Sequence, residues 1–133
     1  MSQENVEFIC AGLDTWNAGD MDAWEGFLAP DAIWHPPTGW PEPGPFIGRE
    51  ATMRQVRRLR EAWDADTTER ISMIDAGDRV VGRLVWHIRG HGPQLPQSEM
   101  EVSCVWTVRK RKIIAFEWFW DHAEALKAAG LRE

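Results

Sequence analysis

The chain has 133 residues, a formal net charge of −6 at pH 7 and an isoelectric point near 5.2, so nucleic acid and anionic membranes are poor candidates for its main partners. No apolar run approaches the roughly 20 residues that span a bilayer, and the N-terminal stretch lacks the basic and apolar parts of a signal peptide. We therefore expect one domain over residues 1–133, located in the cytoplasm, with its two cysteines reduced.

The first 28 residues predict two helices. Apolar residues recur at helical spacing over residues 3–18, at Val6, Ile9, Cys10, Leu13 and Trp16. Gly19 ends this helix and Asp20 caps the next one directly. The short second helix has its own apolar side, which consists of Met21, Trp24, Phe27 and Leu28.

A short strand, a proline-rich loop and a third helix follow. The strand covers residues 32–35, and the loop after it cannot be regular because proline removes a backbone donor and restricts φ. This loop carries Trp40. Residues 49–63 predict a helix, and we interpret its arginine cluster as a solvated face formed by Arg54, Arg57, Arg58 and Arg60.

The second half of the chain predicts strands and one last helix. Side chains alternate with period two over residues 67–74, 79–89, 99–109 and 112–120. On the final strand, the alternation places one set inward: Ile114, Phe116, Trp118 and Trp120. Asp121 then matches a helix N-cap, and Gly130 closes the helix. The order ααβαββββα indicates an α+β fold with an antiparallel-rich sheet whose apolar face is covered by helices.

Several segments together resemble the NTF2-like superfamily, and within it the SnoaL-like, polyketide-cyclase-like group. The resemblance covers nearly the whole chain and is carried by Trp16–Asp22, Asp31–His35, Phe46–Glu50, Asp121–Leu126 and Gly130–Leu131. It implies a cone in which a strongly bent sheet wraps around three helices and encloses a deep apolar pocket. It also implies a homodimer formed through the sheet. Such cones host isomerases, cyclases, dehydratases, epoxide hydrolases and non-catalytic binders, so the fold alone does not define the function.

The same resemblance argues against two of these chemistries. In the ketosteroid isomerase branch, the general base would fall at Pro36 and the oxyanion donors at about Gly12 and Cys104, none of which can perform the role. Epoxide hydrolases of this fold need an Asp-Arg-Asp set inside the cone. The inward strand positions are nearly all apolar, so we expect no inward acid.

Two residues remain as catalytic candidates. His35 lies at a strand end beside the missing base position, and histidine suits acid or base catalysis near neutral pH. Alternatively, it is a structural histidine bonded to the loop. Asp121 matches the pocket acid of polyketide cyclases of this fold, but its role as a helix cap also explains it.

We expect no metal and no cofactor. His87 and His91 are four residues apart, which on a strand separates them by about 13 Å. No cluster of carboxylates or cysteines accompanies them, and the chain lacks phosphate-binding and dinucleotide-binding glycine motifs.

The unusual feature of the composition is nine tryptophans and no tyrosine. These indoles either fill the core of the cone or line a pocket for a small apolar, aromatic or polycyclic molecule. The predicted ligand-binding set is Trp34, Trp40, Trp86, Cys104, Trp106, Trp118 and Trp120. Two functions stay open: a cofactor-free isomerase, cyclase or dehydratase, and a non-catalytic binding or dimeric assembly module.

Overall fold

A single bent sheet dominates the fold of the described residues, which are 2–40, 42, 44–90 and 97–131 of a computed structural model. Its strand order is β2-β1-β6-β5-β4-β3, and only β1 and β6 run parallel to each other. The strands are β1 (Leu28–His35), β2 (Phe46–Ile47), β3 (Trp63–Ala76), β4 (Arg79–Gly90), β5 (Gln97–Arg109) and β6 (Lys112–Phe119).

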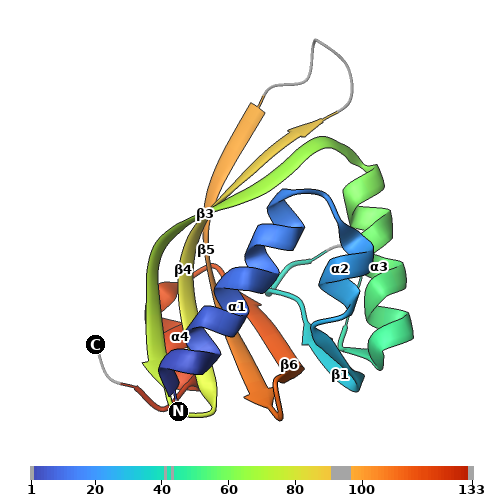
Figure 1. Ribbon diagram of the computed structural model, residues 1–133. Coiled ribbons are helices and arrows are strands. Elements are labelled where there is room, and N and C mark those ends of the chain that lie inside the picture. The colour runs from blue at the N-terminus through green and yellow to red at the C-terminus, as the bar shows by residue number, and fades with distance from the viewer. Residues whose placement is uncertain (1, 41, 43, 91–96, 132–133) are drawn as a thin grey trace.

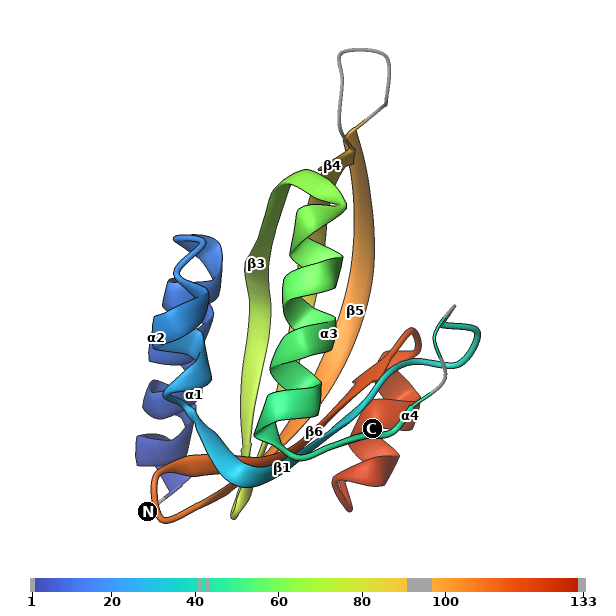
Figure 2. The same cartoon turned by 90° about the vertical axis from the view of Figure 1, so that its right-hand side faces the viewer.

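Irregularities in strand register accompany the bend of the sheet. The pairing shifts between Arg70 and Ser72 on β3 and between Thr107 and Val108 on β5. An extra residue on one strand of a pair increases the local twist and bends that strand. Figures 1 and 2 show the long strands curving around the helices, with β1 and β6 running side by side at the lower end.

Four helices cover the two faces of the sheet unequally. The concave face holds α1 (Ser2–Asn17), α2 (Met21–Glu25) and α3 (Arg49–Glu61), whereas α4 (His122–Ala128) lies on the opposite face (Figures 1 and 2). The main core therefore forms between the concave face and the first three helices. A smaller core beneath α4 consists of Val81, Val105, Ala125 and Leu126. The expected cone of one sheet around three helices is confirmed.

The predicted caps and most inward positions are also confirmed. The side chains of Asp20 and Asp121 accept hydrogen bonds from the amides of Ala23 and Ala123. On β4 and β5, the buried members of the inward set are Val80, Leu84, Trp86, Ile88, Val102, Cys104, Trp106 and Val108. The absence of a side chain at Gly82 makes room for Trp106, because a Cβ at Gly82 would lie 2.6 Å from the Trp106 ring.

Several details of the sequence prediction are wrong. The second helix ends at Glu25, and Leu28 instead begins β1, four residues before the predicted start of that strand. The irregular pairing beside Val108 turns Ile113, and not Ile114, into the core, where its exposure is 0%. The third helix ends before Trp63, which instead begins β3, so that strand starts four residues earlier than predicted. The two-residue strand β2 was not predicted.

The arginine cluster of α3 does not form one solvated face. Arg54, Arg57 and Arg58 pair with carboxylates at the surface, as expected of a solvated face. The Arg60 side chain is only 17% exposed and turns toward the sheet, because it belongs to the last turn of α3, where the chain enters β3. None of the described helices is long and apolar enough to span a membrane.

Candidate functional site

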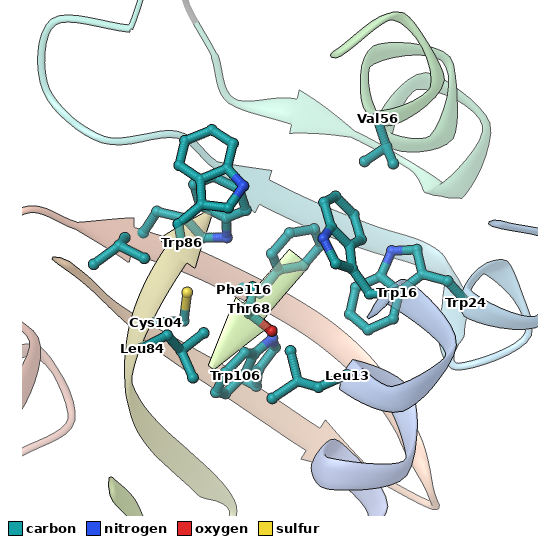
Figure 3. Close-up of a pocket in the computed structure, with 12 residues that line it drawn as sticks. Leu13, Trp16, Trp24, Val56, Thr68, Leu84, Trp86, Cys104, Trp106 and Phe116 are labelled. Atoms are coloured by element: carbon teal, nitrogen blue, oxygen red, sulfur yellow. The ribbon is translucent and has the colours of Figure 1, made fainter. Parts of the chain in front are cut away.

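The interior of the cone holds a small cavity of about 30 Å³, more enclosed than the groove described below, which we call the closed cavity. Side chains from all three concave helices and from four strands line it (Figure 3), and these include Trp16, Trp24, Trp86, Trp106 and Trp118. A volume of this size holds at most one or two water molecules, and a cavity with apolar walls tends to stay dry. The interior is therefore filled by the indoles and has no room for an organic ligand.

Trp34 lies at the centre of the indole packing and is fully buried. Its ring is stacked on that of Phe116, with the centroids 5.8 Å apart and the planes at 10°. The ring of Trp118 lies 5.5 Å away, and that of Trp40 lies 6.2 Å away. Contacts of this kind add to the free energy gained from burial alone, so these rings form a rigid block under the proline-rich loop.

A larger, open groove lies next to this block, at the wide end of the cone. Its volume is about 420 Å³, within the range of small-molecule sites. The apolar side chains that line it are Trp40, Leu59, Trp63, Trp86, Ile88, Met100 and Trp120, and its polar side chains are Glu42, Gln55 and Arg58. Trp86 lines both the groove and the closed cavity, so its indole separates the two spaces.

The proline-rich loop forms one wall of the groove and is held at both sides. The Trp120 Nε1 donates a hydrogen bond to the carbonyl of Thr38 at 3.0 Å. Glu42 lies 3.7 Å from the Arg58 guanidinium on α3. The loop is therefore tied to the end of β6 and to α3, which places Trp40 over the groove.

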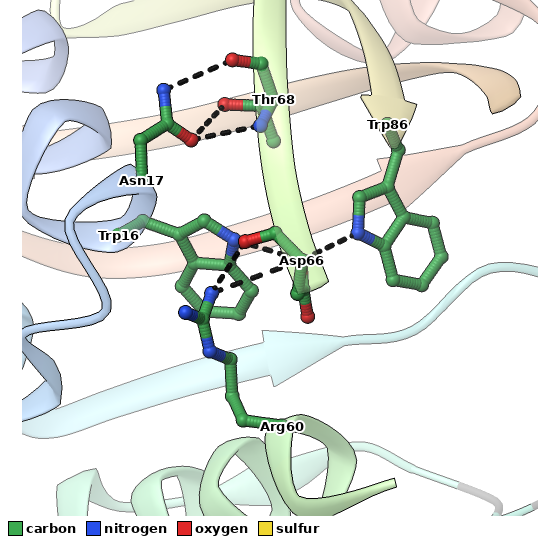
Figure 4. Close-up of polar contacts among 6 residues, drawn as sticks. All are labelled: Trp16, Asn17, Arg60, Asp66, Thr68 and Trp86. Carbon is green, nitrogen blue, oxygen red and sulfur yellow. Dashed lines mark hydrogen bonds and ion pairs between the residues drawn. The ribbon is translucent and has the colours of Figure 1, made fainter. Parts of the chain in front are cut away.

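A buried acid, Asp66, is 4% exposed and lines neither space, but it is hydrogen-bonded to Trp86, which borders both. Its Oδ1 accepts hydrogen bonds from Trp86 Nε1 at 2.7 Å and from Trp16 Nε1 at 3.1 Å (Figure 4). Arg60 donates to the backbone carbonyl of Asp66 at 2.9 Å, and its guanidinium lies 4.8 Å from the centroid of the Trp16 ring. The Oδ2 of Asp66 is buried and has no hydrogen-bond partner in the described part of the chain.

Burial dominates the electrostatics of this pair. It raises the pKa of Asp66, and the hydrogen bond from Trp86, the charge of Arg60 and the hydrogen bond from Trp16 oppose that rise. Burial likewise lowers the pKa of Arg60, and the charge of Asp66 opposes this change. The guanidinium and carboxylate are 3.8 Å apart, too far for a hydrogen bond.

The predicted ligand-binding residues divide between the two spaces. Trp34, Cys104 and Trp106 are at most 2% exposed in the core, and Trp118 lines the closed cavity. Trp40 and Trp120 line the groove, with Trp86 shared. The prediction that Trp120 points into the cone is wrong, because β6 ends at Phe119 and the Trp120 side chain is 43% exposed at the rim.

The predicted catalytic residues lie elsewhere. His35 is half-buried at the end of β1, paired in register with Glu117, and Asp121 is exposed at the start of α4. Neither is among the residues that line the groove or the cavity. His87 contacts Glu69 and Glu99, while His91 lies outside the described residues. Within the described ranges, no three metal-ligating side chains come together.

The prediction that the cone contains no inward acid is wrong, since Asp66 is such an acid. The period-two pattern that predicted the strand was started at Thr67, and extending it back from Thr68 by two residues would have placed Asp66 inward. The assignment of Trp63 to the helix hid its place at the start of β3. Arg60 does belong to the helix as predicted, but it was interpreted as part of a solvated face. No local pattern marks the end of that helix.

Comparison with known proteins supports the fold. The family model for the SnoaL-like domain matches residues 11–116. A solved NTF2-like protein from Burkholderia thailandensis is 28% identical, with a TM-score of 0.76, and the match covers 94% of this chain and 95% of that one. An NTF2-like protein of unknown function from Burkholderia pseudomallei is 18% identical, with a TM-score of 0.78 and coverage of 92% and 95%.

A third solved structure has a described reaction. SalBIII, an epoxide hydrolase/cyclase-like enzyme with a role in pyran ring formation in the polyether salinomycin, is 22% identical, with a TM-score of 0.77 and coverage of 90% and 92%. At this level of identity the likeness concerns the fold. No curated protein matches the chain.

Proposed function

Because the chain belongs to the SnoaL-like domain family, whose fold is shared with cyclases and epoxide-hydrolase-like enzymes, we propose that it binds a small apolar or aromatic molecule in the groove at the mouth of the cone. The observation that carries this proposal is the lining of the groove. Four indoles border a space of about 420 Å³ that is open to solvent.

The lining favours a flat, uncharged ligand. Indole rings offer large apolar faces at low entropic cost, and Met100 adds a side chain that adapts to irregular shapes. The polar side chains Gln55 and Arg58 come from α3, at one side of the groove, where they would orient a ligand.

The closed cavity does not support binding deeper in the cone. A polycyclic molecule occupies far more than about 30 Å³, so it would enter the interior only by displacing core indoles. The body of the proposed ligand therefore stays in the groove and does not enter the closed cavity.

Isothermal titration calorimetry tests this proposal, because its signal, unlike tryptophan fluorescence, does not depend on how many tryptophans a variant retains. Naphthalene derivatives and larger planar ketones should bind with a saturable signal. Trp120→Ala should weaken binding by about 3-fold or more, because it removes one wall of the groove and the bond that holds Thr38.

Ile71→Ala provides a matched control. Ile71 is 49% exposed, close to the 43% of Trp120, but it does not line the groove. Its replacement should leave the affinity unchanged. Equal losses in the two variants, or no binding by the unmodified protein, would contradict the proposal.

A non-catalytic binding module is the second candidate, and one observation favours it: neither His35 nor Asp121 lines the groove or the cavity. Their proposed roles in cofactor-free isomerase, cyclase or dehydratase chemistry stay predictions. With a substrate in hand, His35→Ala and Asp121→Asn decide between the two, because unchanged turnover in both variants removes both residues from the mechanism. The homodimer through the sheet also stays a prediction, which sedimentation equilibrium would test.

A further inference from the structure

The two carboxyl oxygens of Asp66 differ in the hydrogen bonds that they accept. Oδ1 accepts from two indole N–H groups, which use both of its lone pairs. Oδ2 is buried and has no donor near it among the described residues. An ionised carboxylate would spread its charge over both oxygens, and leaving one of them buried without a donor is costly.

A neutral acid fits this arrangement better. In that state Oδ1 is the carbonyl oxygen, which accepts the two indole hydrogen bonds, and Oδ2 carries the proton. The acid proton then has no acceptor in the described part of the chain, so the site presents an unused donor. The Arg60 guanidinium does not supply a hydrogen bond to either carboxyl oxygen, since it lies 3.8 Å from Oδ1 and donates to the backbone carbonyl.

Asp66 does not itself line the groove, but residues next to it do. On β3, Trp63 lines the groove and Thr68 lines the closed cavity, and Asp66 stands between them in sequence. Its register partner across β4 is Ile88, which also lines the groove. Trp86, the donor of the shorter hydrogen bond, borders both spaces. The acid is therefore separated from the groove by side chains of the groove floor.

We propose that the ligand of the groove is an uncharged molecule with an aromatic body and a carbonyl oxygen, and that this oxygen accepts a hydrogen bond from Asp66 Oδ2 at the groove floor. The inference rests on the proposed function, because it names the class of molecule that the same groove binds. Binding includes a small movement of the floor side chains, because Asp66 is almost fully covered.

The charge of the site supports a neutral carbonyl. A ligand amine would carry a positive charge next to Arg60, and like charges this close repel each other. A ligand carboxylate would raise the pKa of Asp66 further and would itself be buried as a charge, which a neutral carbonyl avoids. A ketone or quinone oxygen accepts the available proton and adds no charge to a low-dielectric site.

One neighbouring group is a rival donor. The Nε1 of Trp63 is buried without a partner in the described ranges, and Trp63 lines the groove. A ligand carbonyl could therefore accept from this indole and leave Asp66 unused. The experiment must separate the two donors.

Equilibrium dialysis with a matched pair of probes tests the proposal. 2-Acetylnaphthalene and 2-isopropylnaphthalene have nearly the same shape, and only the first has a carbonyl oxygen. The unmodified protein should bind the ketone about 3- to 10-fold more tightly, the usual worth of one hydrogen bond. If neither probe binds, the proposed function fails; if both bind equally, only this inference fails.

Three variants identify the donor. Asp66→Asn places an amide N–H donor where Oδ2 lies, so it should keep the preference for the ketone. Asp66→Leu should bind both probes equally, and Trp63→Phe should keep the preference. A preference that survives in Asp66→Leu and disappears in Trp63→Phe would assign the donor to Trp63 and overturn the proposal.

The dependence of binding on pH gives a second measurement that needs no apolar variant at this buried position. As the pH rises and Asp66 ionises, the unmodified protein should lose its preference, whereas Asp66→Asn should keep it. Among the described residues that contact the acid, Arg60 from α3 is charged, while Trp16 from α1 and Trp86 from β4 do not titrate. Identical pH profiles in the two proteins would contradict the proposal.

Discussion

Tryptophans line both the closed cavity and the groove, but the two spaces differ in volume and in the exposure of their indoles. Indoles surround about 30 Å³ in the interior, where Trp106 is 2% exposed, and they border about 420 Å³ at the mouth, where Trp120 is 43% exposed. Trp86 belongs to both. The nine tryptophans of this chain therefore have two roles. Those beneath Trp86 stabilise the fold, and those above it form a surface suited to a ligand.

The comparison shows that the surroundings of a tryptophan decide whether its indole belongs to the core or to the groove. A tryptophan on a long central strand is enclosed by neighbours on both sides, so its burial is complete. Trp120 follows the end of β6 and is covered on one side only, so part of its ring stays exposed. Four experiments can break or sharpen this distinction, beginning with the largest expected effect.

Thiol labelling tests whether the cavity is closed. Cys104 lines the cavity, and burial raises the pKa of its thiol. In the Cys10→Ser variant, the remaining Cys104 should react with a thiol reagent at least ~1,000-fold more slowly than a thiol in the unfolded chain, because labelling requires unfolding that costs about 5 kcal/mol or more. The partly exposed Cys10, in a Cys104→Ser variant, is the control. Similar rates for both cysteines would show that the cavity opens readily.

Truncation of a core indole should cause the largest loss of stability. Trp106→Ala should lower the free energy of unfolding by about 3–5 kcal/mol, because the fully enclosed ring leaves a void that the rigid sheet cannot fill. Urea denaturation measures this loss. A change below about 1 kcal/mol would mean that the interior is loosely packed, and the distinction between core and groove would fail.

The buried acid should make stability depend on pH. The pKa of Asp66 is raised above its ordinary value of 3.8, so its contribution to stability is fully present below that pH and is lost as pH rises through the folded-state pKa. Relative to Asp66→Asn, the unmodified protein should lose about 1.4 kcal/mol per pH unit within that window. Urea denaturation of both proteins from pH 3.5 upward, in steps of about half a pH unit, measures the difference. Parallel curves would show that the acid is not buried as described.

Truncation at the rim should have the smallest effect on stability. Trp120→Ala should lower the free energy of unfolding by about 1 kcal/mol or less, because it removes a half-exposed ring and one hydrogen bond to Thr38. The same variant should nevertheless weaken ligand binding. A loss as large as that of Trp106→Ala would place Trp120 in the core and contradict the comparison.

The repeating patterns of the sequence predicted a large part of the fold. Period-two alternation placed Trp86, Cys104 and Trp106 inward, and local capping chemistry placed Asp20 and Asp121 at helix starts. These predictions succeed because alternation and capping are properties of a few adjacent residues, and they hold wherever the strand pairing is regular.

The candidate site could be predicted only in part, because it forms where elements end. The groove joins inward residues of β4 and β5, which alternation predicts, to residues from the loop, the end of α3, the start of β3 and the position after β6, and no period relates these last four. Trp40 and Trp120 could be named from the sequence as large apolar residues, but their exposure at the rim could not.

The sequence by itself determined the order of the elements, the apolar face of the sheet and the membership of the family. Only the tertiary structure decided that Ile113 replaces Ile114 in the core, that Arg60 turns inward, and that Asp66 is buried between two indoles. The physical reason is distance along the chain. Asp66 receives its hydrogen bonds from residues 50 and 20 positions away, and such contacts exist only after the sheet has bent around the helices.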